Sequence, residues 1–135
     1  MDCPPSLNVR QVRIRSGDLV DLIEFLSVDD SVRSWGSRTG GSAQPPFDLD
    51  HDEHIVRIVA QEGASLDGLA FHTSKGRESQ WYGKRGGHPT EYKASADDPI
   101  VGIEREGGTF CPRITRVVRL SEARDVAPGS IASFV

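Results

Sequence analysis

The chain has 135 residues, of which 36% are hydrophobic and 27% are charged, and its net charge is −4 at pH 7. This length suits one domain spanning residues 1–135, and the composition is neither that of a disordered chain nor that of a membrane protein. No apolar run approaches the roughly 20 residues of a membrane helix. Nucleic-acid-binding proteins usually present a basic surface. We therefore expect no membrane insertion and no nucleic-acid partner.

The N-terminal segment MDCPPSLNVR has no apolar stretch of the kind found in secretory signals, which favours a cytoplasmic location. Cys3 and Cys111 lie far apart and form no Cys-x-x-Cys pair, so we expect no zinc site. Two free thiols in a reducing compartment are favoured over a disulfide between them, which the sequence leaves open.

Short apolar alternations, separated by clusters of Gly, Asp and Ser, predict β-strands and hairpins along the chain. In chain order, the predicted strands cover residues 9–15, 19–25, 54–59, 66–73, 99–104 and 113–120. No long segment keeps a 3.6-residue period. The sequence therefore predicts an all-β chain.

An internal repeat relates the first two pairs of predicted strands. With Gly17 set on Gly63, an offset of 46 residues, Asp21 falls on Asp67. The other matches in this register are Ile23 with Leu69, Phe25 with Phe71, Trp35 with Trp81, Gly40 with Gly86, and Gly41 with Gly87. A third unit follows at an offset of 45, from Gly63 to Gly108. One such unit cannot bury its apolar face alone, so we expect three β units packed as a three-sided prism.

These motifs resemble those of jacalin-related lectins, and most closely those of mannose-binding members such as banana lectin. The turn Thr73-Ser74-Lys75-Gly76, the segment Trp81-Tyr82-Gly83 and the pair Gly86-Gly87 follow the family's order. The resemblance covers about residues 9 to 120. It implies a β-prism I fold of three four-stranded antiparallel Greek-key sheets with pseudo-threefold symmetry. It also implies sugar binding without a metal ion. The sequence has no Gly-x-Ser-x-Gly motif or comparable catalytic signal, so we expect no enzymatic activity and no cofactor.

The resemblance further implies that a sugar site joins a Gly-x-x-x-Asp turn to a glycine-rich loop. The aspartate accepts hydrogen bonds from sugar hydroxyls, and glycine allows close approach of the backbone. Units one and two keep both halves, with 19 residues from Asp21 to Gly40 and from Asp67 to Gly86. The candidate carbohydrate-binding residues are Gly17, Asp18, Leu19, Val20, Asp21, Gly40 and Gly41 in unit one, and Gly63, Ala64, Ser65, Leu66, Asp67, Gly86 and Gly87 in unit two.

Unit one is the stronger candidate, because Glu62, Lys84 and Arg85 adjoin the turn and loop of unit two and are expected to narrow or alter its pocket. In unit three, Pro112 stands where the aspartate is expected, and the N-terminal segment has no Gly-Gly pair. We therefore expect the site that the family uses most commonly to be absent. The tail 121–135 is predicted to supply the outer strand of the third sheet through residues 129–135, with a disordered tail as the alternative.

Two further groups of residues invite functional interpretations. The segment Asp48–His54 is rich in metal-ligand side chains, but it lacks the glycine and glutamate positions of an EF-hand loop and contains no His-Glu-x-x-His motif. We expect it to form a charged outer face without a metal ion. Trp35 and Trp81 are able to stack on sugar rings. Their equivalence in the repeat instead favours packing in the core or at a sheet edge.

Together, these observations predict a non-enzymatic lectin for mannose- or glucose-containing glycans. Galactose preference in the family depends on a processed N-terminal glycine, and this chain lacks one. The alternative is a β-prism protein-interaction or targeting module that does not bind sugar. Exposed strand edges also leave a homodimer open, and the sequence decides neither the glycan nor its linkage.

Overall fold

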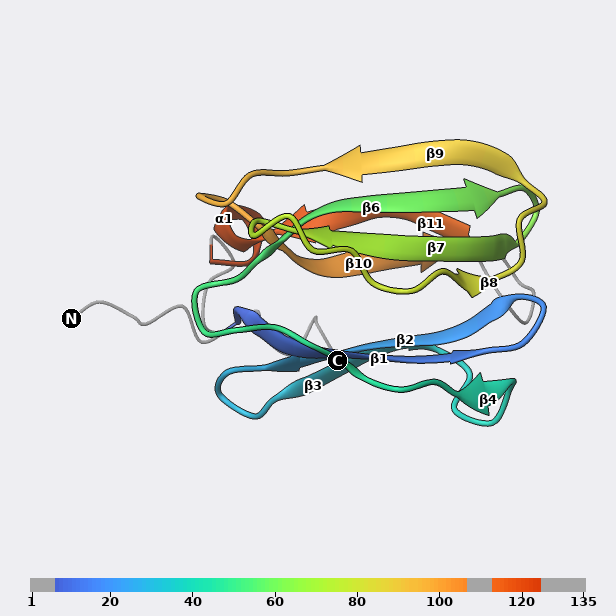
Figure 1. Ribbon diagram of the computed structural model, residues 1–135, viewed down its shortest axis with the longest axis horizontal. Coiled ribbons are helices and arrows are strands. Elements are labelled where there is room, and N and C mark those ends of the chain that lie inside the picture. Colours follow the sequence, from blue (N-terminus) through green and yellow to red (C-terminus); the bar gives the residue numbers. More distant parts are fainter. Residues whose placement is uncertain (1–6, 107–112, 125–135) are drawn as a thin grey trace.

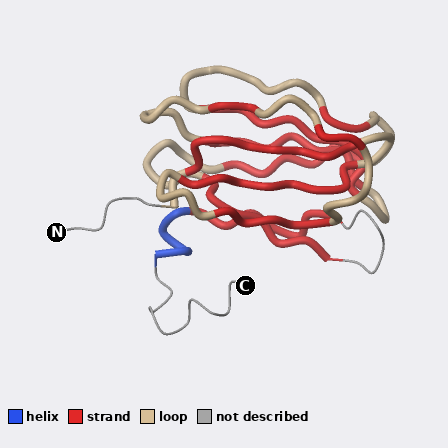
Figure 2. The backbone as a smooth tube through the Cα atoms, turned by 90° about the horizontal axis from the view of Figure 1, so that it is seen from below, coloured by secondary structure: helices blue, strands red, loops and turns tan. Residues whose placement is uncertain are grey.

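The computed structural model describes residues 7–106 and 113–124. Three antiparallel sheets run along the long axis of the molecule, and the turns and loops gather at its two ends (Figures 1 and 2). The hairpin turns of units one and two lie at the same end, on the right of Figure 1.

The first sheet contains β1 (Val9–Ser16), β2 (Val20–Ser27), β3 (Val32–Gly36), β4 (Ser42–Ala43) and β5 (Phe47–Asp48). Its strands lie in the order β3-β2-β1-β4, and β5 also pairs with β1. Ala43 lies opposite Arg15 and Phe47 lies opposite Val12, so β4 and β5 occupy successive parts of one edge of β1. The sheet therefore has four strand positions in a Greek-key order.

The second sheet repeats this plan. It contains β6 (Ile55–Glu62), β7 (Leu66–Thr73), β8 (Tyr82–Gly83) and β9 (His88–Lys93), in the order β8-β7-β6-β9. Both central hairpins show a register irregularity just before the turn, at Arg15/Ser16 in one and at Gln61/Glu62 in the other. The predicted repeat of a Greek-key unit is thus confirmed for units one and two.

The third sheet is described in part, because the strand predicted to complete it lies outside the described residues. Within the described part of the chain it has two strands, β10 (Ile100–Glu106) and β11 (Arg113–Arg119), followed by the short helix α1 (Leu120–Arg124). The helix is an exception to the all-β expectation. It buries Leu120 and Ala123, and the carboxylate of Glu122 accepts a hydrogen bond from the backbone N–H of Arg119 at 2.8 Å. Helix α1 is the one helix in the described part of the chain, and it is too short to cross a membrane.

Several predictions concern residues that lie outside the described ranges. These are the outer strand at 129–135, the pairing of Cys3 with Cys111, and the turn from Gly108 to Pro112. They stay predictions.

One hydrophobic core joins the three sheets. Phe25 of β2 and Phe71 of β7 are fully buried, and their ring centroids are 6.1 Å apart in an edge-to-face contact. Ile103 and Ile114 contribute from the third sheet. Edge-to-face aromatic pairs add to the stabilisation that comes from burial alone, so this contact fixes sheets one and two to each other.

The strand register corrects one match in the repeat. Trp35 lies opposite Ile23 on β2, whereas Tyr82 lies opposite Leu69 on β7. Because Ile23 and Leu69 are equivalent, the counterpart of Trp35 is Tyr82 and not Trp81. Both rings pack edge-to-face on the equivalent phenylalanines, with centroids 5.3 Å apart for Phe25 and Trp35 and 6.2 Å apart for Phe71 and Tyr82.

Trp81 lies one residue before that position, next to the edge strand β8. Its indole N–H donates to the carbonyl of Lys84 at 3.2 Å, and the guanidinium of Arg85 lies 4.0 Å from the centre of its ring. A cation in this position is attracted to the aromatic face. Trp81 therefore packs under the loop that leads to Gly86, where it supports the backbone of unit two.

Candidate carbohydrate site

The two Gly-x-x-x-Asp turns adopt the same local structure. In unit one the N–H of Gly17 donates to the carbonyl of Leu19 at 3.0 Å, and in unit two the N–H of Gly63 donates to that of Ser65 at 2.9 Å. In each unit the aspartate is the second residue of the strand after the turn and is partly exposed. The repeated sequence spacing thus produces a repeated geometry.

In unit one, the structure brings the predicted halves of the site together. A side-chain carbon added at Gly40 would lie 2.6 Å from Oδ1 of Asp21, and one added at Gly41 would come closer still to Oδ2. Gly41 also has a φ of 60°, a conformation that L-residues rarely adopt. Only a pair of glycines therefore lets this loop lie directly against the Asp21 carboxylate.

In unit two, the same halves meet less closely. A side-chain carbon at Gly86 would lie 3.2 Å from Oδ2 of Asp67, whereas one at Gly87 would meet the backbone of Glu62 at 2.5 Å. Gly87 therefore packs on the strand that precedes the turn, as Gly41 does on Ser16. The loop of unit two is thus placed like that of unit one, but further from its carboxylate.

The two candidate sites are in direct contact with each other. The backbone N–H of Lys84 lies 2.9 Å from the carbonyl of Asp67 and 3.0 Å from that of Asp18. The turn of unit one therefore rests on the loop of unit two, and both sites lie at one end of the prism (Figure 1).

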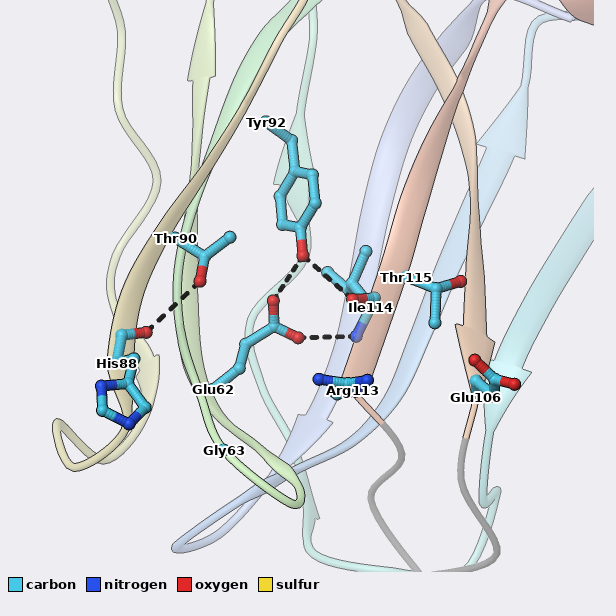
Figure 3. Close-up of a pocket in the computed structure, with 9 residues that line it drawn as sticks. All are labelled: Glu62, Gly63, His88, Thr90, Tyr92, Glu106, Arg113, Ile114 and Thr115. Carbon is cyan, nitrogen blue, oxygen red and sulfur yellow. Dashed lines mark hydrogen bonds between the residues drawn. The ribbon is translucent and has the colours of Figure 1, made fainter.

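Glu62 does not narrow the site of unit two, contrary to the expectation from its position beside Gly63. Its carboxylate turns towards the third sheet (Figure 3) and is buried there. One oxygen accepts the hydroxyl of Tyr92 at 2.5 Å, and the other accepts the backbone N–H of Ile114 at 2.7 Å. Burial, together with the hydrogen bond to Glu62, raises the pKa of Tyr92 above its ordinary value. Glu62 thus ties sheet two to sheet three.

A cavity of about 480 Å³ lies beside this junction, between β9 and the hairpin of β10 and β11 (Figure 3). Polar side chains line it, among them Thr90, Tyr92 and Arg113. Of the predicted sugar-binding residues, it includes Gly63 alone. The cavity is thus a neighbour of the candidate site in unit two, and Asp67 is outside its lining.

At the opposite end of the prism, the acidic segment from Asp48 to His54 is only partly the charged outer face that we expected. Asp50 and Asp52 are exposed and pair with the ammonium group of Lys75, at 3.3 and 2.7 Å. Among residues 7–106 and 113–124, no group of three His, Cys, Asp or Glu side chains is arranged to hold a metal ion.

Glu53 is the exception in this segment, because its side chain is completely buried. The carboxylate accepts hydrogen bonds from the hydroxyl of Thr73 at 2.6 Å, from Nη1 of Arg77 at 2.7 Å and from the N–H of Asp50 at 3.0 Å. Burial by itself raises the pKa of Glu53, but the hydrogen bonds and the charge of Arg77 outweigh it, so the pKa lies below its ordinary value. The family-like turn from Thr73 to Gly76 therefore has a structural role here.

The fold and the paired Asp–Gly-Gly sites define a β-prism domain of the lectin type. A family model, the jacalin-like lectin domain, matches residues 2–111. The chain therefore belongs to the jacalin-like lectin family and is a non-enzymatic, carbohydrate-binding lectin, which confirms the predicted family and the absence of a catalytic role. A comparison with curated protein sequences finds no significant match.

Three similar solved structures confirm the β-prism fold. A prostate-specific WGA16 glycoprotein lectin is 20% identical, with a TM-score of 0.69, over 83% of this chain and 80% of that chain. Malaysian banana lectin is 22% identical, with a TM-score of 0.68, over 84% of each chain. A mannose-binding jacalin-related lectin from Ananas comosus is 22% identical, with a TM-score of 0.64, over 84% of this chain and 83% of that chain.

Proposed function

We propose that the protein binds mannose- or glucose-containing glycans through the sites of units one and two, with unit one as the principal site. The observation that carries this proposal is the contact between the Asp21 carboxylate and the backbone of Gly40 and Gly41. This contact places a negatively charged hydrogen-bond acceptor next to glycine backbone, at a position that is partly exposed to solvent.

This arrangement suits a neutral, polyhydroxylated ligand. A carboxylate accepts hydrogen bonds from two hydroxyls at once, and such charge-assisted bonds are stronger than neutral ones. The amides of residues 18–21 and of the glycine pair are donors for the ring and hydroxyl oxygens. Equivalent roles in unit two belong to Asp67, to the turn 64–67, and to Gly86 and Gly87.

Two further observations support the proposal. One of the similar solved structures is described as a mannose-binding jacalin-related lectin. In addition, the two sites lie side by side at one end of the prism, because Lys84 bonds to the turns of both units. Two neighbouring weak sites gain apparent affinity for a branched glycan through effective concentration.

The test is a glycan array competed with free methyl α-mannoside, followed by Asp21→Asn, Asp67→Asn and the double variant. Loss of the charged acceptor should weaken binding at each site by at least about tenfold, and the double variant should not bind. Asp30→Asn is the matched control, because Asp30 is exposed in a different turn and has a φ of 71°, which asparagine tolerates. A double variant that binds like the parent would refute the site assignment.

A second candidate function is a protein-interaction or targeting module without sugar binding. It is favoured by the sequence of unit three, where Pro112 stands in place of the aspartate of the site that the family uses most commonly. An exposed strand edge accepts a strand from a partner, including a second copy of the chain. A silent glycan array, combined with a dimer in light scattering, would favour this function.

A further inference from the structure

Arg15 holds the glycine loop of unit one from the side of β1. Its Nε donates to the carbonyl of Gly40 at 2.8 Å, and its Nη2 donates to the carbonyl of Gly41 at 2.9 Å. The rigid guanidinium fork matches two neighbouring carbonyls, which a lysine ammonium group could not do with the same geometry.

This fork fixes the direction of a backbone N–H group. In a planar trans peptide, the C=O and the following N–H point in opposite directions. Because the carbonyl of Gly40 faces Arg15, the N–H of Gly41 faces away from Arg15. Two consecutive glycines would otherwise sample many conformations, so the arginine reduces the ordering that a ligand has to impose.

Arg105 supports the other half of the same site, although it belongs to unit three. Its Nη1 donates to the carbonyl of Trp35 at 2.8 Å, and its Nη2 donates to the carbonyl of Val20 at 3.0 Å. The peptide that begins at Val20 carries the N–H of Asp21, so its orientation is fixed by the same argument. Arg105 thus joins the start of β2 to the end of β3 beneath the aspartate.

The register shows that Arg105 is unusual for its position. It lies opposite Ile114 in its hairpin, as Ile14 lies opposite Ile23 and Ala60 opposite Leu69. Ile14 and Ala60 are buried core residues, whereas Arg105 is only partly buried. Unit three therefore replaces a core side chain with an arginine that donates to main-chain carbonyls of unit one.

Unit two has neither arginine. Gln61 occupies the register position of Arg15. Gln61 lies opposite Gly68 and Arg15 lies opposite Leu22, and the offset of 46 makes Gly68 the counterpart of Leu22. Arg105 of unit three supports unit one. By the pseudo-threefold arrangement, the equivalent residue of unit one should support unit two, and that residue is Ile14. Both sites thus have an aspartate and a glycine pair, but only the site of unit one has arginines that bond to its backbone carbonyls among the described residues.

We propose that Arg15 and Arg105 are positioning residues that pre-organise the sugar site of unit one and make it the tighter of the two sites. This inference rests on the proposed function, because it assigns a role to residues behind Asp21 and the glycine pair. It also gives unit three, in which Pro112 replaces the expected aspartate, a part in binding at unit one.

The experiment measures methyl α-mannoside affinity by NMR titration in an Asp67→Asn parent, where only unit one binds. Arg15→Gln introduces the residue that unit two has at this position, Gln61, and Arg105→Ile introduces the residue that unit one has, Ile14. Each variant should weaken binding by about threefold to tenfold. Arg15→Lys should bind as weakly as Arg15→Gln, because the charge remains and the fork is lost. Arg13→Gln, a nearby arginine on the same strand, should leave the affinity unchanged.

A second background separates positioning from general stability. In an Asp21→Asn parent, where only unit two binds, Arg15→Gln should leave the affinity of unit two unchanged. Arg105→Ile is checked by thermal melting, and Arg15→Gln alone decides the test if the Ile variant does not fold. Parent-like affinity of Arg15→Gln at unit one would overturn the inference and leave the proposed function intact. An Asp67→Asn parent that binds no sugar would overturn both.

Discussion

Carboxylates are used in two different ways at the two ends of the prism. Glu53, at one end, is completely buried and accepts hydrogen bonds from Thr73, Arg77 and the backbone of Asp50. Asp21, at the other end, is partly exposed and lies against the backbone of two glycines. A fully buried and hydrogen-bonded carboxylate stabilises the fold, whereas a partly exposed one beside glycine backbone is suited to a ligand.

Glu62 shows that location alone does not decide between these uses. It lies next to the candidate site of unit two, yet it is buried and bonded to Tyr92 and Ile114, as Glu53 is to its own partners. What distinguishes Asp21 is that the two loop residues facing its carboxylate, Gly40 and Gly41, are glycines. Four predictions test this distinction.

The largest effect is expected at Glu53. Glu53→Ala removes the acceptor for a hydroxyl, a guanidinium and a backbone N–H, and should lower the free energy of unfolding by about 3 kcal/mol. Urea denaturation measures this change. Asp52→Ala is the matched control, since Asp52 is exposed and forms a surface ion pair with Lys75, and its unfolding midpoint should match that of the wild type. Equal destabilisation by both variants would contradict the role given to Glu53.

The next effect concerns the glycines that face the aspartates. Gly40→Ala places a methyl group 2.6 Å from Oδ1 of Asp21, so we expect it to abolish sugar binding at unit one. Gly86→Ala places one 3.2 Å from Oδ2 of Asp67, which a small shift relieves, so binding at unit two should weaken only slightly. Sugar titrations in the Asp67→Asn and Asp21→Asn backgrounds measure each site separately. Similar losses for the two alanines would show that the closer contact in unit one has no consequence.

The sequence predicted the parts of this molecule that depend on local pattern. The period-2 runs identified the central strands, and the offset between Gly17 and Gly63 identified the repeated turns and the glycine pairs that meet the aspartates. The same offset wrongly matched Trp35 with Trp81. Unit two has one extra residue between Leu69 and Tyr82 and one residue fewer between Tyr82 and Gly86, so the offset of 46 holds at both ends and hides the shift in between.

The predictions that failed concern contacts between segments far apart in the chain. Glu53 reads as one more charge in an acidic run, and its burial becomes apparent only when Thr73 and Arg77 are brought against it. Glu62 reads as a neighbour of Gly63, and its orientation is set by Ile114 of another sheet. Neither pairing has a sequence signature. The partners of Glu53 lie 20 and 24 residues further along the chain, and Ile114 lies 52 residues from Glu62 in another sheet.

Acidification should separate the two kinds of carboxylate. The pKa of Glu53 is lowered in the folded state, so its contribution to stability is present above its unfolded pKa and is lost as the pH falls through the folded value. We expect unfolding free energy to be nearly constant from neutral pH to about pH 5 and to decline below about pH 4.5. Asp29 and Glu122 also have lowered pKa values, so the informative quantity is the difference between wild type and Glu53→Gln. That difference should shrink on acidification, and a constant difference would contradict the pKa argument.

The smallest effect is expected for the carboxylate that lies at the sugar end but is turned inward. Tyr92→Phe removes the hydroxyl that bonds to Glu62 and leaves the bond from Ile114 to Glu62 in place, so it should cost about 1 kcal/mol of unfolding free energy. Sugar binding at unit two should stay unchanged, because the carboxylate of Glu62 faces the third sheet and not Asp67. Thermal melting and a titration of unit two in the Asp21→Asn background measure the two quantities on the same sample. Weaker sugar binding without loss of stability would place Glu62 and Tyr92 with Asp67 in the ligand site, and would show that burial does not separate structural from ligand-binding carboxylates at this end of the prism.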